Sequence, residues 1–195
     1  ARALGLNDPG RSWHTDRAPI LRIADWQGQV MAALGHIAQS LLALTGSDIA
    51  EVALAQAGSS STMPQKQNPV GASALLALSH QFTGLRASLQ AAAQHQHQRD
   101  GAAWFTEWMV VPPLCLSLAS ALQHARTLAE GITPHPVQMH AALENGLGLI
   151  HAEALSFALA AVMPRPEAQR VTKALCQEAL VKQVPLGDLA RADYP

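Results

Sequence analysis

The sequence predicts an all-α protein whose main part is a bundle of long helices. Ala, Leu and Gln, which favour helices, are abundant, whereas the 195 residues include one Tyr and three Phe. Apolar residues also recur at three- and four-residue intervals over stretches longer than an ordinary globular helix. Gly and Pro, rather than low-complexity linkers, separate these stretches.

Three long helices are expected in the first two thirds of the chain. The first runs from about Asp16 to Leu44, where apolar residues follow a helical period. The second starts at Asn68-Pro69, because Pro is tolerated in a first helical turn, and extends to about Gln98. The third spans about Pro112 to Glu130 and stops at a glycine. We predict a central long-helix portion over residues 1–131.

The last third of the chain predicts a small C-terminal helical domain over residues 132–195. Its shorter helices are expected near Val137–Glu144, Leu149–Val162, Glu167–Val181 and Leu186–Ala190. Glycines and prolines separate them: Gly146, Gly148, Pro164, Pro166 and Pro185.

Composition limits the classes of partner and compartment. The formal charge is −1, so no basic surplus calls for nucleic acid. The apolar runs, such as Ala72–Leu78 and Ala152–Met163, are too short or too polar to cross a bilayer, and no signal peptide precedes them. Cys115 and Cys176 lie far apart and are expected to be reduced. A cytoplasmic protein without a membrane or nucleic-acid partner is therefore expected.

The segment 57–69 between the first two long helices predicts a catalytic lid. Its residues Gly58 to Pro69 read G-S-S-S-T-M-P-Q-K-Q-N-P. Small residues let the backbone bend over a ligand, while Lys66 supplies a point charge and Asn68 a carboxamide. A Ser/Gly linker with a chance Lys is the alternative, and the ordered S-S-x-M-P-x-K-x-N-P string argues against it.

That string resembles the signature of the fumarase/aspartase superfamily. The fixed positions present are Ser60, Ser61, Met63, Pro64, Lys66, Asn68 and Pro69. Ser59 stands where a glycine is usual. The resemblance implies elimination or addition next to a carboxylate, through a carbanion whose charge spreads onto that carboxylate.

Three further stretches are similar to those of the bacterial carboxymuconate cycloisomerases within this superfamily. Trp13–Ala18 resembles W-H-T-Q-R-D, with Asp16 in place of Gln and Ala18 in place of Asp. Gln96–Asp100 resembles Q-H-E-R-D with Gln98 in place of Glu, and Trp104–Trp108 resembles W-x-x-E-W. In adenylosuccinate lyases the last stretch reads S-S-x-E-R, and its Ser and Arg bind the nucleotide phosphate. Because Trp108 removes that cation, a small polycarboxylate is the expected substrate.

The resemblance implies lactonisation of 3-carboxy-cis,cis-muconate in the breakdown of aromatic acids. Ser60 takes the place of the family's catalytic serine and is the expected proton carrier. The other residues expected to bind substrate are Lys66, Asn68, Ser61, Thr62, Met63, Arg17, Thr15 and His14. Arg17 has an alternative role, a surface ion pair with Asp16 or Asp25, and His14 could be an ordinary exposed histidine.

No metal or organic cofactor is expected. His95 and His97 are two residues apart, so a helix would point them to different faces. No Cys or carboxylate joins them, or the pair His135 and His140, at the spacing of a zinc site.

The resemblance also implies a homo-oligomer, expected to be a tetramer, with active sites shared between subunits. Superfamily members are more than twice as long as this chain, so their N-terminal domain and first central helix are expected to be missing, and the fragment to be inactive alone. Two other functions stay open: another lyase of the superfamily acting on a small amino or imino dicarboxylate, and a non-catalytic helical scaffold.

Overall fold

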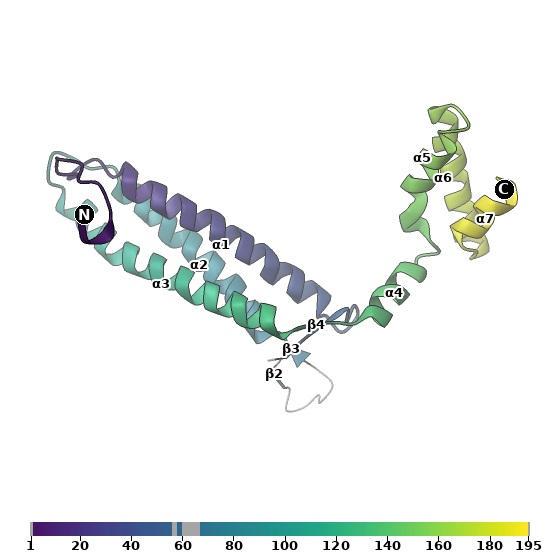
Figure 1. Cartoon of the computed structure of the whole chain (residues 1–195), viewed down its shortest axis with the longest axis horizontal. Coiled ribbons are helices and arrows are strands. Elements are labelled where there is room, and N and C mark those ends of the chain that lie inside the picture. Colours follow the sequence, from purple (N-terminus) through teal and green to yellow (C-terminus); the bar gives the residue numbers. More distant parts are fainter. Residues whose placement is uncertain (1, 56–57, 60–66, 195) are drawn as a thin grey trace. The chain divides into compact units, whose positions relative to one another are not determined.

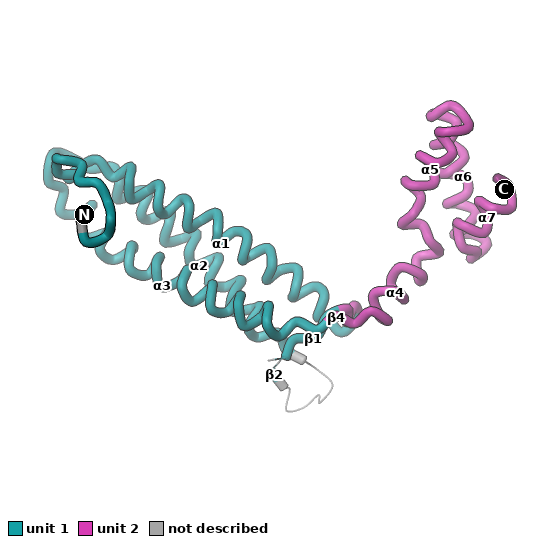
Figure 2. Tube along the Cα trace, in the orientation of Figure 1, with its two compact units in different colours: residues 1–48, 52–133 teal, residues 49–51, 134–195 magenta. Residues whose placement is uncertain are grey.

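The computed structural model describes residues 2–55, 58–59 and 67–194. The prediction of an all-α protein is confirmed (Figure 1). Contacts divide the chain into two compact units (Figure 2). Unit 1 comprises residues 1–48 and 52–133, and unit 2 comprises residues 49–51 and 134–195.

Three long helices form unit 1: α1 (Ala18–Leu44), α2 (Val70–Ala92) and α3 (Gly101–Gly131). They lie side by side and alternate in direction (Figure 1). Their shared core is apolar, and its most buried members are Met31, Ala38, Ala72, Leu75, Phe82, Leu114 and Ala121. A Cβ at Gly35 would lie 2.7 Å from Ser79 Oγ, so the missing side chain lets α1 and α2 approach closely.

The third helix differs from its expected bounds. It begins at Gly101 rather than Pro112 and continues through Pro112 and Pro113. Asp100 starts it, because its side-chain oxygens accept hydrogen bonds from the backbone N–H of Ala103 at 3.1 Å and of Gln96 at 2.9 Å. These donors, first that of Gln96, lower the pKa of the Asp100 carboxyl. The proline pair therefore lies inside a long helix that packs against two others, although it removes two backbone donors.

Other boundaries moved less. The helix α2 ends at Ala92 rather than near Gln98, and α1 begins two residues later than expected, at Ala18. Among the described helices, α3 alone is long and apolar enough to cross a bilayer by length and composition, which is weak evidence because a core helix passes the same test. One face of α3 packs against α1 and α2, but several of its apolar side chains, such as Met109 and Leu116, stay exposed.

Two short ribbons interrupt the helices. In the first, β1 (Val52–Leu54) pairs with β4 (Ile132–Pro134), and Ala55 N–H donates to Gly131 O at 3.0 Å. In the second, β2 (Gly58–Ser59) and β3 (Gln67–Asn68) pair antiparallel. The second ribbon pairs the two segments on either side of residues 60–66. Those residues belong to the expected lid and lie outside the described residues.

Unit 2 is built from shorter helices. They are α4 (Pro136–Glu144), the 3₁₀ helix η2 (Leu149–His151), α5 (Ala152–Leu159), α6 (Arg165–Lys182) and α7 (Leu186–Asp193). Leu175, Leu186 and Ala190 form its buried cluster, against which Leu155 and Val171 pack. Both cysteines of the chain are free thiols, as expected.

We predict that Phe82→Ala destabilises unit 1 by about 3–5 kcal/mol, because the side chain is 1% exposed and its loss leaves a cavity. Phe105→Ala is the matched control: the same residue type, 59% exposed, should cost under about 1 kcal/mol. Denaturant unfolding followed by tryptophan fluorescence measures both, since all four Trp lie in unit 1. Equal costs would contradict the assigned core.

Candidate active site

The residues expected to form the site fall into two groups in the structure. Ser60, Ser61, Thr62, Met63 and Lys66 lie outside the described residues. Asn68 is described: it is half-buried in β3, two residues before α2 begins. The remaining group, with His14, Thr15 and Arg17, precedes α1.

Arg17 is held in a two-point ion pair with Glu107 of α3. Its Nε lies 2.8 Å from Glu107 Oε2 and its Nη2 lies 2.5 Å from Oε1. The third guanidinium nitrogen, Nη1, donates to the carbonyl of Trp13 at 2.6 Å. The two charged side chains are only 15% and 14% exposed, so the pair is largely shielded from water. Such a planar, bidentate contact fixes the segment before α1 onto α3.

The alternative role for Arg17 was right in predicting an ion pair and wrong about the partner. Asp16 pairs with Arg11 at 3.2 Å, and Asp25 pairs with Arg86 at 2.6 Å. Glu107 is the acid of the W-x-x-E-W stretch, so the sequence held the signal without showing which cation it meets. Three-dimensional contact between positions 90 residues apart was needed to see it.

Aromatic rings surround this ion pair. The His14 and Trp104 ring centroids are 5.8 Å apart, and Trp104 stacks on Trp108 at 6.5 Å and 22°. Trp13, His14, Trp104 and Trp108 line a pocket of about 220 Å³ together with Arg17 and Glu107. Two of the three sequence stretches that resemble the cycloisomerases therefore meet at one place, and Asp100 of the third starts the helix that carries Trp104.

His95 was considered from the sequence only as a metal ligand, and the structure shows another feature of it. Both ring nitrogens of His95 are buried and lack a hydrogen-bond partner among the described residues. A polar ring in that state needs a partner that the described part of one chain does not supply. Within that same part, no group of three or more His, Cys, Asp or Glu side chains could hold a metal ion.

Asn68 and the expected site residues before α1 lie at opposite ends of the helix bundle. The aromatic pocket is at the start of α1 and α3, whereas Asn68 precedes the start of α2, which runs the other way (Figure 1). With 27 residues at about 1.5 Å each, α1 is about 40 Å long. A single chain therefore does not bring Asn68 to Arg17 or His14.

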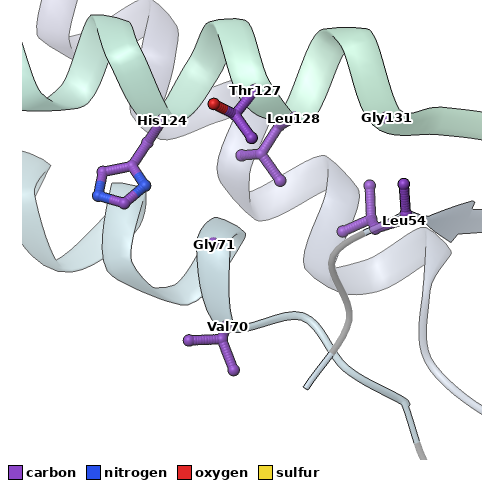
Figure 3. Close-up of a pocket in the computed structure, with 8 residues that line it drawn as sticks. Leu54, Val70, Gly71, His124, Thr127, Leu128 and Gly131 are labelled. Carbon is purple, nitrogen blue, oxygen red and sulfur yellow. The ribbon is translucent and has the colours of Figure 1, made fainter. Parts of the chain in front are cut away.

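A second pocket, of about 200 Å³, lies near Asn68. Figure 3 shows His124, Thr127 and Leu128 of α3 facing the start of α2 at Val70 and Gly71, with Leu54 of β1 alongside. No described Arg or Lys lines it. Its mostly apolar wall could not by itself balance the charge of a polycarboxylate, so the cation for such a ligand must come from elsewhere.

Comparison with known proteins connects these features to a family. A family model described as "Lyase" matches residues 7–84. The chain is 35% identical over 186 residues to 3-carboxy-cis,cis-muconate cycloisomerase of Pseudomonas putida, covering 94% of this chain and 44% of that protein. The corresponding enzyme of Pseudomonas aeruginosa is 37% identical over 183 residues, covering 92% and 40%. This chain is therefore similar to enzymes of the lyase family along almost its whole length.

A solved structure shows the same similarity. The 3-carboxy-cis,cis-muconate lactonizing enzyme from Pseudomonas putida matches with a TM-score of 0.85 and 32% identity, covering 100% of this chain and 43% of that one. The chain thus spans less than half the length of these relatives. A relative with a different name matches at similar identity: the nitrosuccinate lyase of Streptomyces davaonensis is 31% identical over 196 residues (98% of this chain, 41% of that protein).

We predict that Glu107→Gln destabilises unit 1 by about 3 kcal/mol, because Arg17 is left charged and largely buried without its partner. Asp25→Asn is the matched control, since that carboxylate is 49% exposed in its pair with Arg86 and should cost under about 1 kcal/mol. Urea unfolding at neutral pH measures both. A small cost at position 107 would mean that the pair is not shielded as the structure has it.

Proposed function

We propose that the enzyme containing this chain is a cycloisomerase that lactonises 3-carboxy-cis,cis-muconate. The carrying observation is the aromatic pocket of Trp104 and Trp108, in which the guanidinium of Arg17 is already bound to Glu107. The described lining of this pocket offers no free guanidinium for a nucleotide phosphate, and this supports a small carboxylate substrate. Relatives that bear the cycloisomerase name support the same reaction.

The proposed chemistry follows from the residues of the lid. One substrate carboxylate attacks the diene and forms the lactone C–O bond. The displaced π electrons move to the carbon beside a second carboxylate, which becomes an enediolate. Lys66 and Asn68 stabilise that charge, each donor contributing about 10²–10³ in rate. Ser60 donates the proton that completes the addition, and the positive charge of Lys66 stabilises the Ser60 alkoxide that remains.

The active site is proposed to combine residues from different chains. Since one bundle holds Asn68 and the Arg17–Glu107 pair about a helix length apart, an antiparallel neighbour is needed to bring the lid of one chain to the aromatic pocket of another. Exposed apolar side chains on α1 and α3 support association along the bundle: Ile23, Trp26, Ile37, Met109 and Leu116. We propose a homo-oligomer, a tetramer, as in the resembled superfamily.

We predict that Ser60→Ala in the full-length enzyme lowers kcat by about 10²–10⁴ while KM changes little, because the proton transfer is lost and binding groups stay. Lys66→Met should raise KM and lower kcat together, since its charge serves both the bound anion and the transition state. Loss of the diene's ultraviolet absorbance with 3-carboxymuconate is the assay. Unchanged turnover in Ser60→Ala would remove the assigned proton carrier.

A mixing experiment tests the shared site. We predict that Ser60→Ala and His14→Ala enzymes, each poorly active, regain activity when their subunits are exchanged under mild denaturant and reassembled. Some sites then receive an intact lid from one chain and an intact pocket from another. Mixing Ser60→Ala with Lys66→Met is the control, because both defects lie on one lid and every lid stays damaged. Equal recovery in the two mixtures would contradict a site built across chains.

The second candidate is another lyase acting on a small amino, imino or nitro dicarboxylate. The resemblance to a nitrosuccinate lyase at 31% identity favours keeping it. A panel of such acids assayed beside 3-carboxymuconate separates the two enzymes by kcat/KM. A non-catalytic scaffold would turn over none of them, and the complete Ser60, Lys66 and Asn68 set argues against it.

A further inference from the structure

A groove in unit 2 with charged side chains along an otherwise mostly apolar lining shares no residue with the proposed active site. It runs between α5 and α6 and has a volume of about 400 Å³. The α5 side contributes Glu153, Ser156 and Phe157, and the α6 side contributes Arg165, Gln169, Thr172, Lys173 and Cys176.

Three polar side chains of α6 form a ladder along this groove. Arg165, Gln169 and Lys173 follow one another at intervals of four residues, so they share a helix face. The first and last are eight positions apart, which corresponds to about 12 Å along the axis. The guanidinium carbon of Arg165 lies 5.2 Å from the centroid of the Phe157 ring, which places this cation against an apolar wall.

The two cations of the ladder differ from the other cations of unit 2. Arg170 pairs with Glu167, Lys182 with Glu178 and Arg191 with Asp188, each within one helix turn. Arg165 and Lys173 have no ion pair with any carboxylate of the described residues, and both line the groove. Among the described Arg and Lys side chains of this unit, the unpaired positive charge is therefore gathered in one place.

A buried hydroxyl gives a second, independent observation. Thr172 is 6% exposed, lines the groove, and its Oγ1 has no hydrogen-bond partner among the described residues. Elsewhere in this chain, helical hydroxyls bond the carbonyl four residues earlier: Thr83 does so at 3.0 Å and Thr106 at 2.9 Å. A buried hydroxyl without a partner is costly, so a ligand atom that reached this oxygen would remove the cost.

We propose that this groove binds a small linear dicarboxylate. Arg165 binds one carboxylate and Lys173 binds the other, and Gln169 donates a hydrogen bond between the two cations. The carbon chain of the ligand lies along Phe157 and Ala160, and the hydroxyl of Thr172 gains a partner at the floor. Glu153 faces the same space and repels the ligand, so it limits the affinity.

The thiol in the groove takes no part in charge recognition. Burial raises the pKa of Cys176, so it stays neutral at physiological pH and serves as an apolar wall atom. We therefore infer reversible binding and no covalent step at this site.

Calorimetric titration of the whole chain with adipate tests the proposal. Adipate should bind in the millimolar range or tighter, and hexanoate, which has the same carbon chain and one carboxylate, about tenfold more weakly. Arg165→Gln and Lys173→Gln should each weaken adipate binding about tenfold, and Glu153→Gln should tighten it. Arg170→Gln is the matched control, because that cation lies on α6 outside the groove and pairs with Glu167.

Thr172→Val separates a ligand contact from a structural role. Removing an unpartnered buried hydroxyl should leave unfolding unchanged or raise stability, while adipate binding weakens. The proposal is overturned if adipate and hexanoate bind alike, if Arg170→Gln matches Arg165→Gln, or if no heat of binding is seen at millimolar adipate. None of these outcomes depends on Ser60 or Lys66, so the proposed lactonisation stands or fails separately.

Discussion

The length and rigidity of three antiparallel helices decide what one chain can bring together. The ends of a 27-residue helix lie about 40 Å apart. The packed core between α1, α2 and α3 keeps each helix from bending. The segments β2 and β3, which flank the lid, lie at one end of the three-helix bundle. The residues of the aromatic pocket lie at the other end. This separation is the basis of the proposal that the active site is assembled between bundles, and the exposed apolar side chains along α1 and α3 support that proposal.

Among the described residues of unit 1, the Arg17–Glu107 pair is the one strongly shielded charge contact. Burying two charges costs several kcal/mol of desolvation, and a bidentate geometry with a third bond to the Trp13 carbonyl offsets that cost. The pair adds little net stability by this accounting. What it contributes is position: a segment without regular secondary structure is held on α3, and His14 is placed against Trp104. A pocket built from indoles needs such a fixed neighbour to keep its shape.

The sequence predicted what depends on local chemistry and missed what depends on distant contacts. Apolar periodicity identified α1 within two residues, since burial of one face follows directly from spacing. The start of α3 was misplaced because Pro112 looked like a first-turn proline, whereas Asp100 already caps the helix three turns upstream of it. The partner of Arg17 was missed for a related reason, since Asp16 and Asp25 are near in sequence and Glu107 is near only in space. The roles of the lid residues stay a prediction from sequence.

The pattern of charge pairing in unit 2 distinguishes the groove between α5 and α6 from the rest of its surface. On an exposed helix, acids and bases spaced three or four residues apart neutralise each other at little energy, as Glu178 and Lys182 do. Arg165 and Lys173 depart from that pattern although Glu153 lines the same groove. Both cations are exposed and solvated by water, so the cost of the empty groove comes from the unpartnered hydroxyl of Thr172. A ligand with two carboxylates can contact both cations, whereas a ligand with one carboxylate contacts only one of them.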